Sequence, residues 1–385
     1  MILAVYGTTG ELIKLAPLLR ALAARGAPAM TVCTAQQPEQ IPPMLADFGL
    51  APPDVWVADG ARGRDLERAG DVPVWLASVA RGVARHRRRL GRALRDDGRP
   101  PLVIVHGDTF TTVLGSLIGR LLRVPVAHVE AGLRSGDWRN PFPEELNRRI
   151  TSRLATVHLA PGEWAAGNLR RARVGGTIVD TGANTIRDAL ALVDPAAQAA
   201  VRTPPGRFGL VSVHRFELLR SRPRLEALLA LLREESERVP LVFIDHPVTV
   251  RALAAAGLDP LLDAPGIARV PRQRYVPFIA LLKRSAFLVT DSGGCQEECA
   301  ELRHPCLVHR AATERRDGLG GPVVLSRLDT GVVRSFIERL PDTPPARGDA
   351  ARPTDVILAE LERRGAIPPA PARDGELSAA PRTTP

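Results

Sequence analysis

The chain of 385 residues has little lysine, little cysteine and no long apolar run. Each of these features bears on which classes of protein the sequence is compatible with. No stretch approaches the ~20 consecutive apolar residues that a membrane-spanning helix needs. The start, Met-Ile-Leu-Ala-Val, also lacks the basic segment that opens a signal peptide. We therefore predict a cytoplasmic protein with no membrane segment.

The four cysteines contain no CxxC pair, which argues against a zinc site or a disulfide framework. Three of them lie near His304 and His309 in the sequence, but packing of a strand and a helix explains this grouping better than a metal does. No segment resembles a Mg²⁺ site or the glycine fingerprint of nicotinamide binding. We expect neither a metal nor an organic cofactor, and reduced thiols in the core. The four thiols are those of Cys33, Cys295, Cys299 and Cys306.

Only two of the 52 basic residues are lysines, Lys14 and Lys283. Together with abundant Ala, Pro and Gly, this ratio is typical of a genome with biased nucleotide composition, so the net charge of +10 says little about partners. The densest basic run, 81–95, falls in a long helical pattern whose arginines form the solvated face. The sequence therefore does not predict nucleic-acid binding. Lys14 is informative because the chain rarely uses lysine.

Short apolar runs alternate with helical patterns along most of the chain. The predicted strands are 2–6, 30–34, 102–105, 126–129, 157–160, 177–180, 209–213, 241–244, 268–270, 287–290 and 306–308. Predicted helices include 12–24, 111–122 and 223–235. This alternation indicates βαβ units, and the continuous apolar strands indicate parallel sheets with helices on both faces.

The alternation breaks at 195–207, a Pro- and Ala-rich stretch, and then begins again. The length also fits two domains of ordinary size. We predict an α/β fold with two doubly wound Rossmann-like domains facing across a cleft, at 1–182 and 183–345. A C-terminal helix at 346–366 and a disordered tail at 367–385 are expected to follow.

In the first domain, polar residues follow the predicted strands, where open α/β folds bind ligands. Gly7 comes directly after the first strand and permits a tight turn, and the helix start that follows favours an anion. Lys14 lies within that helix. Asp108 and Glu130 follow two later strands, and Glu144 belongs to a run at 128–149 that is dense in carboxylates. Capping of the next helix is the alternative role for each of these acids.

In the second domain, His214, Arg215 and His246 follow predicted strands and are expected to face the ligand. The pair Gly293 and Gly294, after Ser292, would let backbone N–H groups approach a diphosphate at a helix start. Two further residues complete this prediction, Glu298 as an acceptor for ribose hydroxyls and Arg315 or Arg316 as a charge for phosphate. The alternatives are stabilisation of the helix dipole by the acids and an exposed ion pair for the arginines.

Eight motifs, in this order and at this spacing, resemble those of the non-hydrolysing UDP-N-acetylglucosamine 2-epimerases. They are GTTGELIKLAP, VHGDTFTT, HVEAGLRSGD, NPFPEELNRR, TGANTIRDAL, VHRFE, TDSGGCQEE and TERRD. The likeness extends to about residue 340. It implies the two-domain GT-B architecture, interconversion of UDP-N-acetylglucosamine and UDP-N-acetylmannosamine, and a homodimer.

The resemblance also implies roles for individual residues. The positions that match the family's proposed acid–base residues are Asp108, Glu130, Glu144 and His214. Those that match its nucleotide contacts are Lys14, Ser292, Gly293, Gly294, Glu298 and Arg315, with Phe278 near the uracil. In the implied reaction UDP leaves, C1 gains oxocarbenium character, a base removes the acidified C2 proton, and UDP adds back after protonation from the opposite face.

The chain departs from the family pattern at several positions on the ligand side. Thr9 and Gly10 stand where the family carries Arg-Pro, Gln37 replaces a His, and 216–218 replace Arg-Glu-Asn. Several of these positions border the allosteric UDP-N-acetylglucosamine site of bacterial members, so we do not expect that regulation here. Two alternatives to epimerisation follow. One is a glycosyltransferase that passes the sugar of a UDP-sugar to an acceptor, and the other is a binding protein without turnover.

Overall fold

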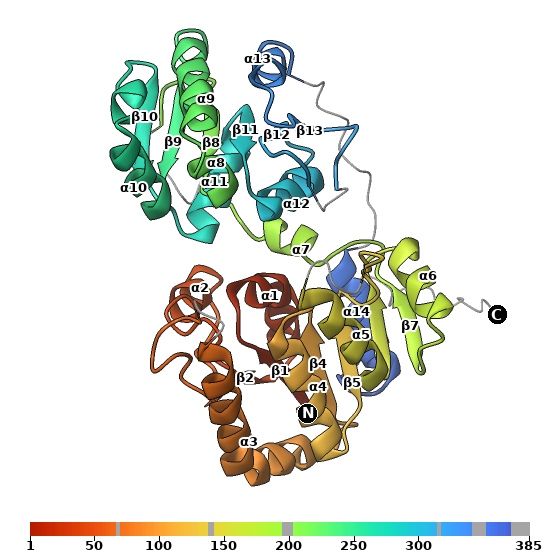
Figure 1. Cartoon of the computed structure of the whole chain (residues 1–385). Helices are drawn as coiled ribbons and strands as arrows, with labels where there is room; N and C mark the ends of the chain where they lie inside the picture. Colours follow the sequence, from red (N-terminus) through yellow and green to blue (C-terminus); the bar gives the residue numbers. More distant parts are fainter. Residues whose placement is uncertain (67–69, 138–141, 195–202, 314–316, 341–351, 371–385) are drawn as a thin grey trace, which may run out of the picture. The chain divides into compact units, whose positions relative to one another are not determined.

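The computed structural model describes residues 1–66, 70–137, 142–194, 203–313, 317–340 and 352–370 (Figure 1). The chain divides into two compact units. Unit 1 comprises 1–185 together with 351–385, and unit 2 comprises 186–350. Among the helices of these described stretches, none has the length and apolar character needed to cross a membrane.

Unit 1 contains a seven-stranded parallel sheet in the order β3-β2-β1-β4-β5-β6-β7. Its strands are β1 (Ile2–Tyr6), β2 (Met30–Cys33), β3 (Val55–Trp56), β4 (Leu102–His106), β5 (Val126–Val129), β6 (Val157–Ala160) and β7 (Thr177–Asp180). Its helices are α1 (Thr9–Ala24), α2 (Ile41–Asp47), α3 (Asp71–Asp96), α4 (Phe110–Leu122), α5 (Glu144–Leu154), α6 (Glu163–Arg171) and α14 (Pro353–Arg363).

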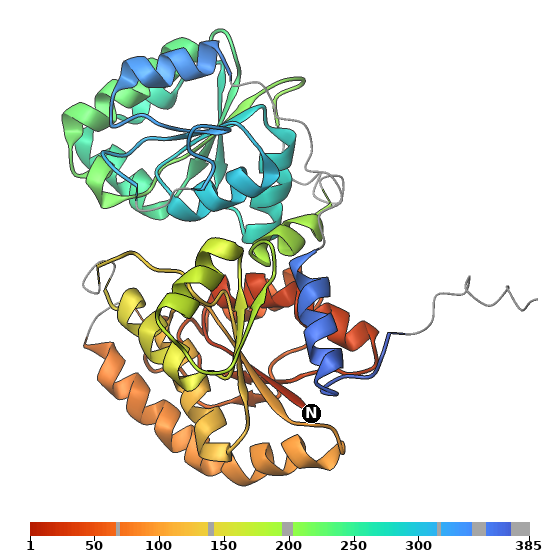
Figure 2. The same cartoon turned by 90° about the vertical axis from the view of Figure 1, so that its right-hand side faces the viewer.

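Helices cover both faces of this sheet, which is why its central strands are buried throughout and mostly apolar. Figure 2 shows α1 and α14 on one face and α3, α4 and α5 on the other. The last helix, α14, therefore returns to unit 1, where it packs on α1 and Arg25 pairs with Glu362 at 3.3 Å. The strand order reverses between β1 and β4, and in open α/β folds ligands bind beside such a reversal, at the carboxyl edge of the sheet.

Unit 2 contains a six-stranded parallel sheet in the order β10-β9-β8-β11-β12-β13. Its strands are β8 (Gly209–Ser212), β9 (Leu241–Asp245), β10 (Ile267–Pro271), β11 (Phe287–Thr290), β12 (Cys306–Val308) and β13 (Val323–Leu325). Its helices are α7 (Ile186–Ala191), α8 (Phe216–Leu219), α9 (Arg222–Glu235), α10 (Pro247–Ala256), α11 (Tyr275–Arg284), α12 (Gly293–Leu302) and α13 (Thr330–Glu338), with a 3-10 helix η2 (Asp259–Leu262).

The short helix α7 is fixed to unit 2 by two specific contacts. The Nζ of Lys283 donates to the carbonyl oxygens of Leu190 and Val193, at 2.6 and 2.7 Å, and so satisfies groups that the end of a helix leaves open. Arg187 pairs with Glu301 of α12 at 2.9 Å. The second of the chain's two lysines therefore has a structural role, as the anchor of the first helix of unit 2.

The α/β fold of two doubly wound units and all eleven predicted strands are confirmed, with ends that differ by one residue at most. The long helix over the basic run is confirmed as α3, and the three predicted helices are confirmed as α1, α4 and α9. The sequence did not reveal β3 and β13, because runs of two and three residues carry no periodic pattern.

Candidate active site

The predicted residues of unit 1 gather at the carboxyl edge of its sheet, beside the reversal of strand order. Lys14 lies in α1, which follows β1, and Asp108 and Glu130 follow β4 and β5 directly. Glu144 is the first residue of α5. Gly7, after β1, is required by close packing, because a Cβ at this position would lie 2.0 Å from the hydroxyl oxygen of Thr34.

Glu130 is the residue with the most closely defined surroundings. Its Oε1 accepts hydrogen bonds from the Nζ of Lys14 at 2.8 Å and from the Nδ2 of Asn184 at 2.6 Å. The Nε2 of His106 lies 3.5 Å from Oε2. The side chains of Lys14 and Glu130 are only 12% and 11% exposed, so their charges interact in a partly desolvated setting. The informative lysine of the sequence is thus the ionic partner of a predicted acid–base residue.

Asp108 is joined to α5 by an arginine. Its Oδ2 accepts from the Nε and Nη2 of Arg148, at 2.9 and 2.6 Å, and its backbone carbonyl accepts from the Nδ2 of Asn147. Asp108 does not cap α4, because that role belongs to Thr109, whose hydroxyl accepts from the backbone N of Thr112. The capping alternative for Asp108 is therefore wrong, and its carboxylate is oriented by a cation instead.

Glu144 and Glu145, adjacent in sequence, have different surroundings. Glu145 is fully buried and accepts from the backbone N of Ser135 and from Arg149, so it supports the loop before α5. Glu144 is half-buried, and its Oε2 is enclosed without a hydrogen-bond partner among the described residues. Of the two acids, Glu145 stabilises the local structure, whereas Glu144 has a carboxyl oxygen that no described residue hydrogen-bonds.

The start of α1 is not an open anion site. The Oε2 of Glu11 accepts from the backbone N of Gly7 and of Thr8, at 2.8 and 2.9 Å. The side-chain oxygen of Gln37 accepts from the backbone N of Thr9 at 2.8 Å. The expectation that this turn offers N–H groups to an anion is therefore wrong, because the protein's own side chains occupy them.

Glu11 also joins the loops after β1 and β4. Its Oε1 accepts from the hydroxyl groups of Thr109 and Thr112, at 2.5 and 3.3 Å. The side chain is 2% exposed, and this burial raises the pKa of Glu11 to about 6 against the opposing effect of its hydrogen-bond donors. The carboxyl thus fixes the loop that carries Asp108.

In unit 2, His214 and His246 form a pair after β8 and β9. Their ring centroids lie 4.4 Å apart. The backbone N of His214 and of Arg215 donate to Asp291, which is 1% exposed, and the Nε2 of His246 lies 3.0 Å from the hydroxyl of Ser212. Burial lowers the pKa of His214 and lowers that of His246 to about 4. Both rings are therefore neutral at neutral pH in the ligand-free protein.

The Gly-Gly motif of unit 2 opens helix α12. Ser292 is the N-cap, and its hydroxyl accepts from the backbone N of Cys295 at 3.4 Å. Gly293 is buried and Gly294 exposed. Glu298, one turn on, lies beside Tyr275, where burial and the Glu298 carboxyl raise the pKa of the phenol well above its ordinary value.

The structure describes only some of the remaining residues that were predicted to contact the nucleotide. Phe278 is half-buried in α11. Arg315 and Arg316 lie outside the described residues. His304 and His309 hydrogen-bond to the hydroxyls of Ser285 and Ser326, and the four cysteines carry free thiols. Within the part of the chain that the structure describes, no group of three or more His, Cys, Asp or Glu is arranged to hold a metal.

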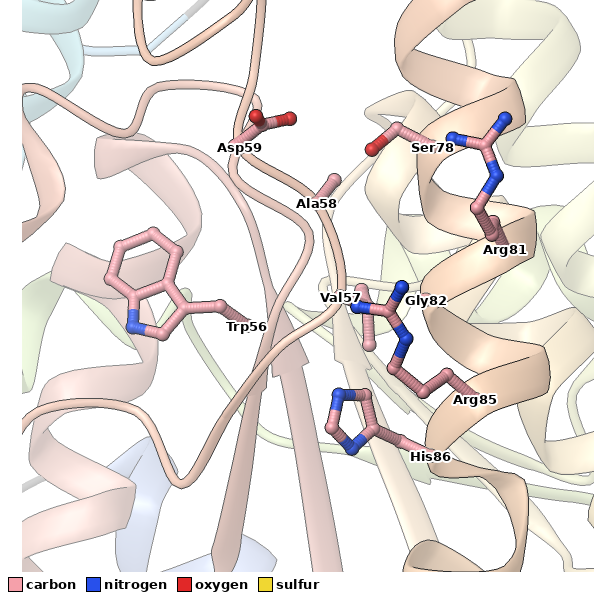
Figure 3. Close-up of a pocket in the computed structure, with 9 residues that line it drawn as sticks. All are labelled: Trp56, Val57, Ala58, Asp59, Ser78, Arg81, Gly82, Arg85 and His86. Atoms are coloured by element: carbon pink, nitrogen blue, oxygen red, sulfur yellow. The ribbon is translucent and has the colours of Figure 1, made fainter.

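A separate cavity of about 300 Å³ lies in unit 1, between the loop after β3 and the middle of α3 (Figure 3). Close contact of these elements requires Gly82, because a Cβ there would lie 1.8 Å from the carbonyl oxygen of Val57. Arg81 and Arg85 line the cavity from α3, and the indole of Trp56 points away from that helix. None of the predicted acid–base or nucleotide residues lines it, so this cavity is not the candidate active site.

Sequence reasoning missed four residues that the structure places in contact with predicted site residues or their loops: Glu11, Arg148 and Asn184 in unit 1, and Asp291 in unit 2. Each lies inside one of the eight motifs, and this position in a motif is the feature of the sequence that could have identified it as a site residue. Which of these side chains contact each other could not be predicted from the sequence. Asn184 and Glu130 are 54 residues apart, and Arg148 and Asp108 are 40 residues apart.

Comparison with known proteins gives one consistent result. The profile of a family described as UDP-N-acetylglucosamine 2-epimerase matches residues 78–349. The UDP-N-acetylglucosamine 2-epimerase of Yersinia pestis is 33% identical over 344 residues, which cover 84% of this chain and 85% of that protein. The enzyme of the same name from Escherichia coli K12 is 32% identical over 358 residues, with coverage of 88% and 90%.

Solved structures agree with the sequence relatives. The UDP-GlcNAc 2-epimerase of Methanocaldococcus jannaschii matches with a TM-score of 0.76 and 27% identity, covering 94% of this chain and 99% of that one. The enzyme of Neisseria meningitidis, solved with UDP-GlcNAc bound, matches with a TM-score of 0.70 and 26% identity, covering 94% and 99%.

Proposed function

The chain belongs to the UDP-N-acetylglucosamine 2-epimerase family of isomerase-type enzymes, and we propose that it inverts C2 of UDP-N-acetylglucosamine to give UDP-N-acetylmannosamine, through elimination and re-addition of UDP. The observation that carries the proposal is the set of acids at the carboxyl edge of the first sheet. Asp108 and Glu130 lie just beyond the ends of the adjacent strands β4 and β5, and each is paired with a cationic side chain.

The chemistry requires such a set. The C2 proton is too weakly acidic for a carboxylate to remove it directly in water. Departure of UDP from C1 gives that carbon oxocarbenium character and acidifies C2, after which a base takes the proton and leaves a 2-acetamidoglucal. Inversion then needs a proton delivered to the opposite face and re-addition of UDP. At least two proton-handling groups on opposite faces of the ring are therefore required.

Asp108, Glu130 and Glu144 are our candidates for these groups. Arg148 fixes the direction of the Asp108 carboxylate, and Lys14 fixes that of Glu130. Glu144 keeps a carboxyl oxygen that no described residue engages. Lys14 is also a candidate for phosphate binding by resemblance, and its ion pair with Glu130 would link departure of UDP to the acid–base residues.

We assign UDP binding chiefly to unit 2. The start of α12 at Ser292 and Gly293 supplies backbone N–H groups for the diphosphate, and Glu298 supplies an acceptor for ribose. The remaining candidates are Arg215, His246, Phe278, Gly294 and Arg315, with His214 as phosphate partner or proton relay. The neutral state of His214 and His246 suits imidazoles that gain a proton only when an anion arrives. The homodimer and the cytoplasmic location expected from the sequence stay predictions.

Incubation with UDP-N-acetylglucosamine in D2O, followed by NMR, tests the proposal. Deuterium at C2 together with UDP-N-acetylmannosamine is the expected result. Free N-acetylmannosamine would indicate the hydrolysing reaction. Transfer of sugar to an added acceptor without C2 exchange would favour the glycosyltransferase alternative, and unchanged substrate with bound UDP would favour a binding protein. Each of these other outcomes contradicts the proposed reaction.

A further inference from the structure

Asn184 is the second donor to the carboxylate of Glu130 and has no role among the predicted residues. Its Nδ2 lies 2.6 Å from the same Oε1 that Lys14 contacts at 2.8 Å. Two donors that converge on one oxygen fix both the position and the rotation of a carboxylate more tightly than one does. We propose that Asn184 is a positioning residue that sets the Glu130 carboxylate for proton transfer, an inference that rests on the proposed function.

The backbone of Glu130 shows why this carboxylate needs positioning. Glu130 has a φ of +66°, the left-handed region that a residue with a side chain rarely adopts. The strands on either side hold the peptide in place, through hydrogen bonds from Gly107 N to Val129 O and from Ala131 N to Leu159 O, both 3.0 Å long. This conformation directs the side chain away from the path that a continuing strand would give it. The hydrogen bonds from Lys14 and Asn184 then determine the position of the carboxylate group.

Asn184 follows a bend that hydrogen bonds tie to the sheet. The hydroxyl of Thr181 donates to the carbonyl oxygens of Ala160 and Ala183, at 2.9 and 2.8 Å, and so ties the turn to the end of β6. Gly182 has a φ of +74°, which suits glycine. Asn184 is therefore presented to Glu130 by a fixed backbone. It also lies two residues before the first residue of unit 2.

The two donors contribute differently. The titratable groups near Glu130 include Lys14 from α1, His106 from β4 and His128 from β5. His128 is held neutral, because burial lowers its pKa to about 3. The neutral amide of Asn184 adds no charge and only orients the Glu130 carboxylate. Its removal therefore leaves the ionic surroundings intact and tests positioning alone.

The experiment compares Asn184→Ala with the wild type in C2 exchange and in calorimetric binding of UDP. We expect kcat to fall by at least 10-fold while the Kd of UDP changes less than twofold, because the candidate nucleotide contacts other than Lys14 belong to unit 2 and the substitution leaves the ammonium group of Lys14 in place. Loss of a hydrogen bond to the ionised form should also move the acidic limb of the kcat profile up by about one pH unit. An unchanged pH profile and an unchanged kcat would overturn the inference.

Asn168→Ala is the matched control. The Nδ2 of Asn168 donates to the carbonyl oxygen of Gly132 at 2.9 Å, so this second asparagine supports the same loop two residues beyond Glu130. Its removal should lower stability without moving the pH profile. If both variants shift the profile equally, Asn184 acts by general support of the loop and the proposal is wrong. Should Asn184→Ala fail to fold, Asn184→Asp keeps the shape and should shift the profile further.

A readout independent of turnover separates this inference from the proposed function. NMR of protein carrying ¹³C-labelled glutamate, with Glu130→Gln used to assign the resonance, gives the titration midpoint of Glu130 directly. A midpoint that is higher in Asn184→Ala than in the wild type supports positioning even if C2 exchange is absent. Equal midpoints refute it even if the wild type is an active epimerase.

Discussion

The side-chain oxygen of Gln37 accepts hydrogen bonds from both the backbone N and the hydroxyl of Thr9, at 2.8 and 3.0 Å. Both positions depart from the family pattern, so the two departures meet in one contact. With Glu11, which accepts from Gly7 and Thr8, this contact occupies the N–H groups at the start of α1. The start of α1 is therefore an internally satisfied turn in this chain.

We therefore expect Thr9→Val to change UDP affinity less than twofold and to lower the free energy of unfolding by about 1 kcal/mol, the cost of one lost hydrogen bond. The same substitution in a Gln37→Ala background should cost much less, because the acceptor is already gone. Urea denaturation of the four proteins and calorimetry with UDP measure both effects. A tenfold loss of UDP affinity in Thr9→Val would show that the hydroxyl serves the nucleotide instead.

Glu11 predicts a specific dependence of stability on pH. Its pKa is about 6 in the folded protein, above the ordinary carboxyl value of 4.5, so the folded state binds this proton more tightly than the unfolded state. The resulting stabilisation is fully present below pH 4.5 and is lost as the pH rises through 6. Between pH 7 and pH 5 the free energy of unfolding should gain about 1 kcal/mol from this group.

Urea denaturation at the two pH values checks this gain, and Glu11→Gln is the comparison. The variant cannot titrate at this position, so the difference in stability between wild type and variant should change by about 1 kcal/mol between pH 7 and pH 5. Its amide would also face donors from Gly7 and Thr8, so lower stability is expected at both pH values. A difference that does not vary with pH would contradict the raised pKa.

The fold was predictable because its evidence is local. Continuous apolar runs such as Ile2–Tyr6 and Leu102–His106 define strands buried on both faces, and the spacing between them leaves room for the crossover helices of parallel sheets. The return of α14 to unit 1 was not predictable, because it depends on contacts such as Arg25 with Glu362, which are 337 residues apart.

The site was predictable only as a set of positions. Strand ends converge at one edge of a parallel sheet, so Asp108 and Glu130 could be expected there. Their hydrogen-bond partners could not be predicted, because Lys14 and Glu130 are separated by 116 residues and such a contact produces no periodic pattern in the sequence. Motif membership identified which segments matter. The structure was needed to show which side chain contacts which.

The pKa of His246 should change when UDP binds. Burial is the largest cause that lowers its pKa to about 4, so the ring is neutral in the free protein at pH 7. A diphosphate bound beside it favours the charged form and raises its pKa, so UDP binding should take up a proton and strengthen as the pH falls. NMR titration is practical because the chain has only eight histidines. A midpoint that is the same with and without UDP would place the diphosphate elsewhere.

Glu298 should contribute to nucleotide affinity, whereas its neighbour Glu297 should not. Loss of a charged hydrogen bond to ribose in Glu298→Ala is expected to weaken UDP binding by roughly 1.5–3 kcal/mol. Glu297 is 9% exposed and serves as the matched control, since Glu297→Ala removes an equal charge from the same turn of α12. Isothermal calorimetry distinguishes the two. Equal losses of affinity would indicate a general effect on the helix rather than a ribose contact.

Asp108→Asn should separate chemistry from binding. The amide keeps the size of the side chain, but it cannot act as a base, and the charge that pairs with Arg148 at 2.6 Å is lost. We expect C2 exchange to fall by about 100-fold or more, with the Kd of UDP nearly unchanged. Asp137→Asn, an exposed carboxylate of the same acidic run, should leave exchange at the wild-type rate. If Asp108→Asn exchanges C2 at a near-normal rate while unfolding more easily in urea, the Asp108–Arg148 pair only joins β4 to α5, and the proton must be moved by Glu130 and Glu144.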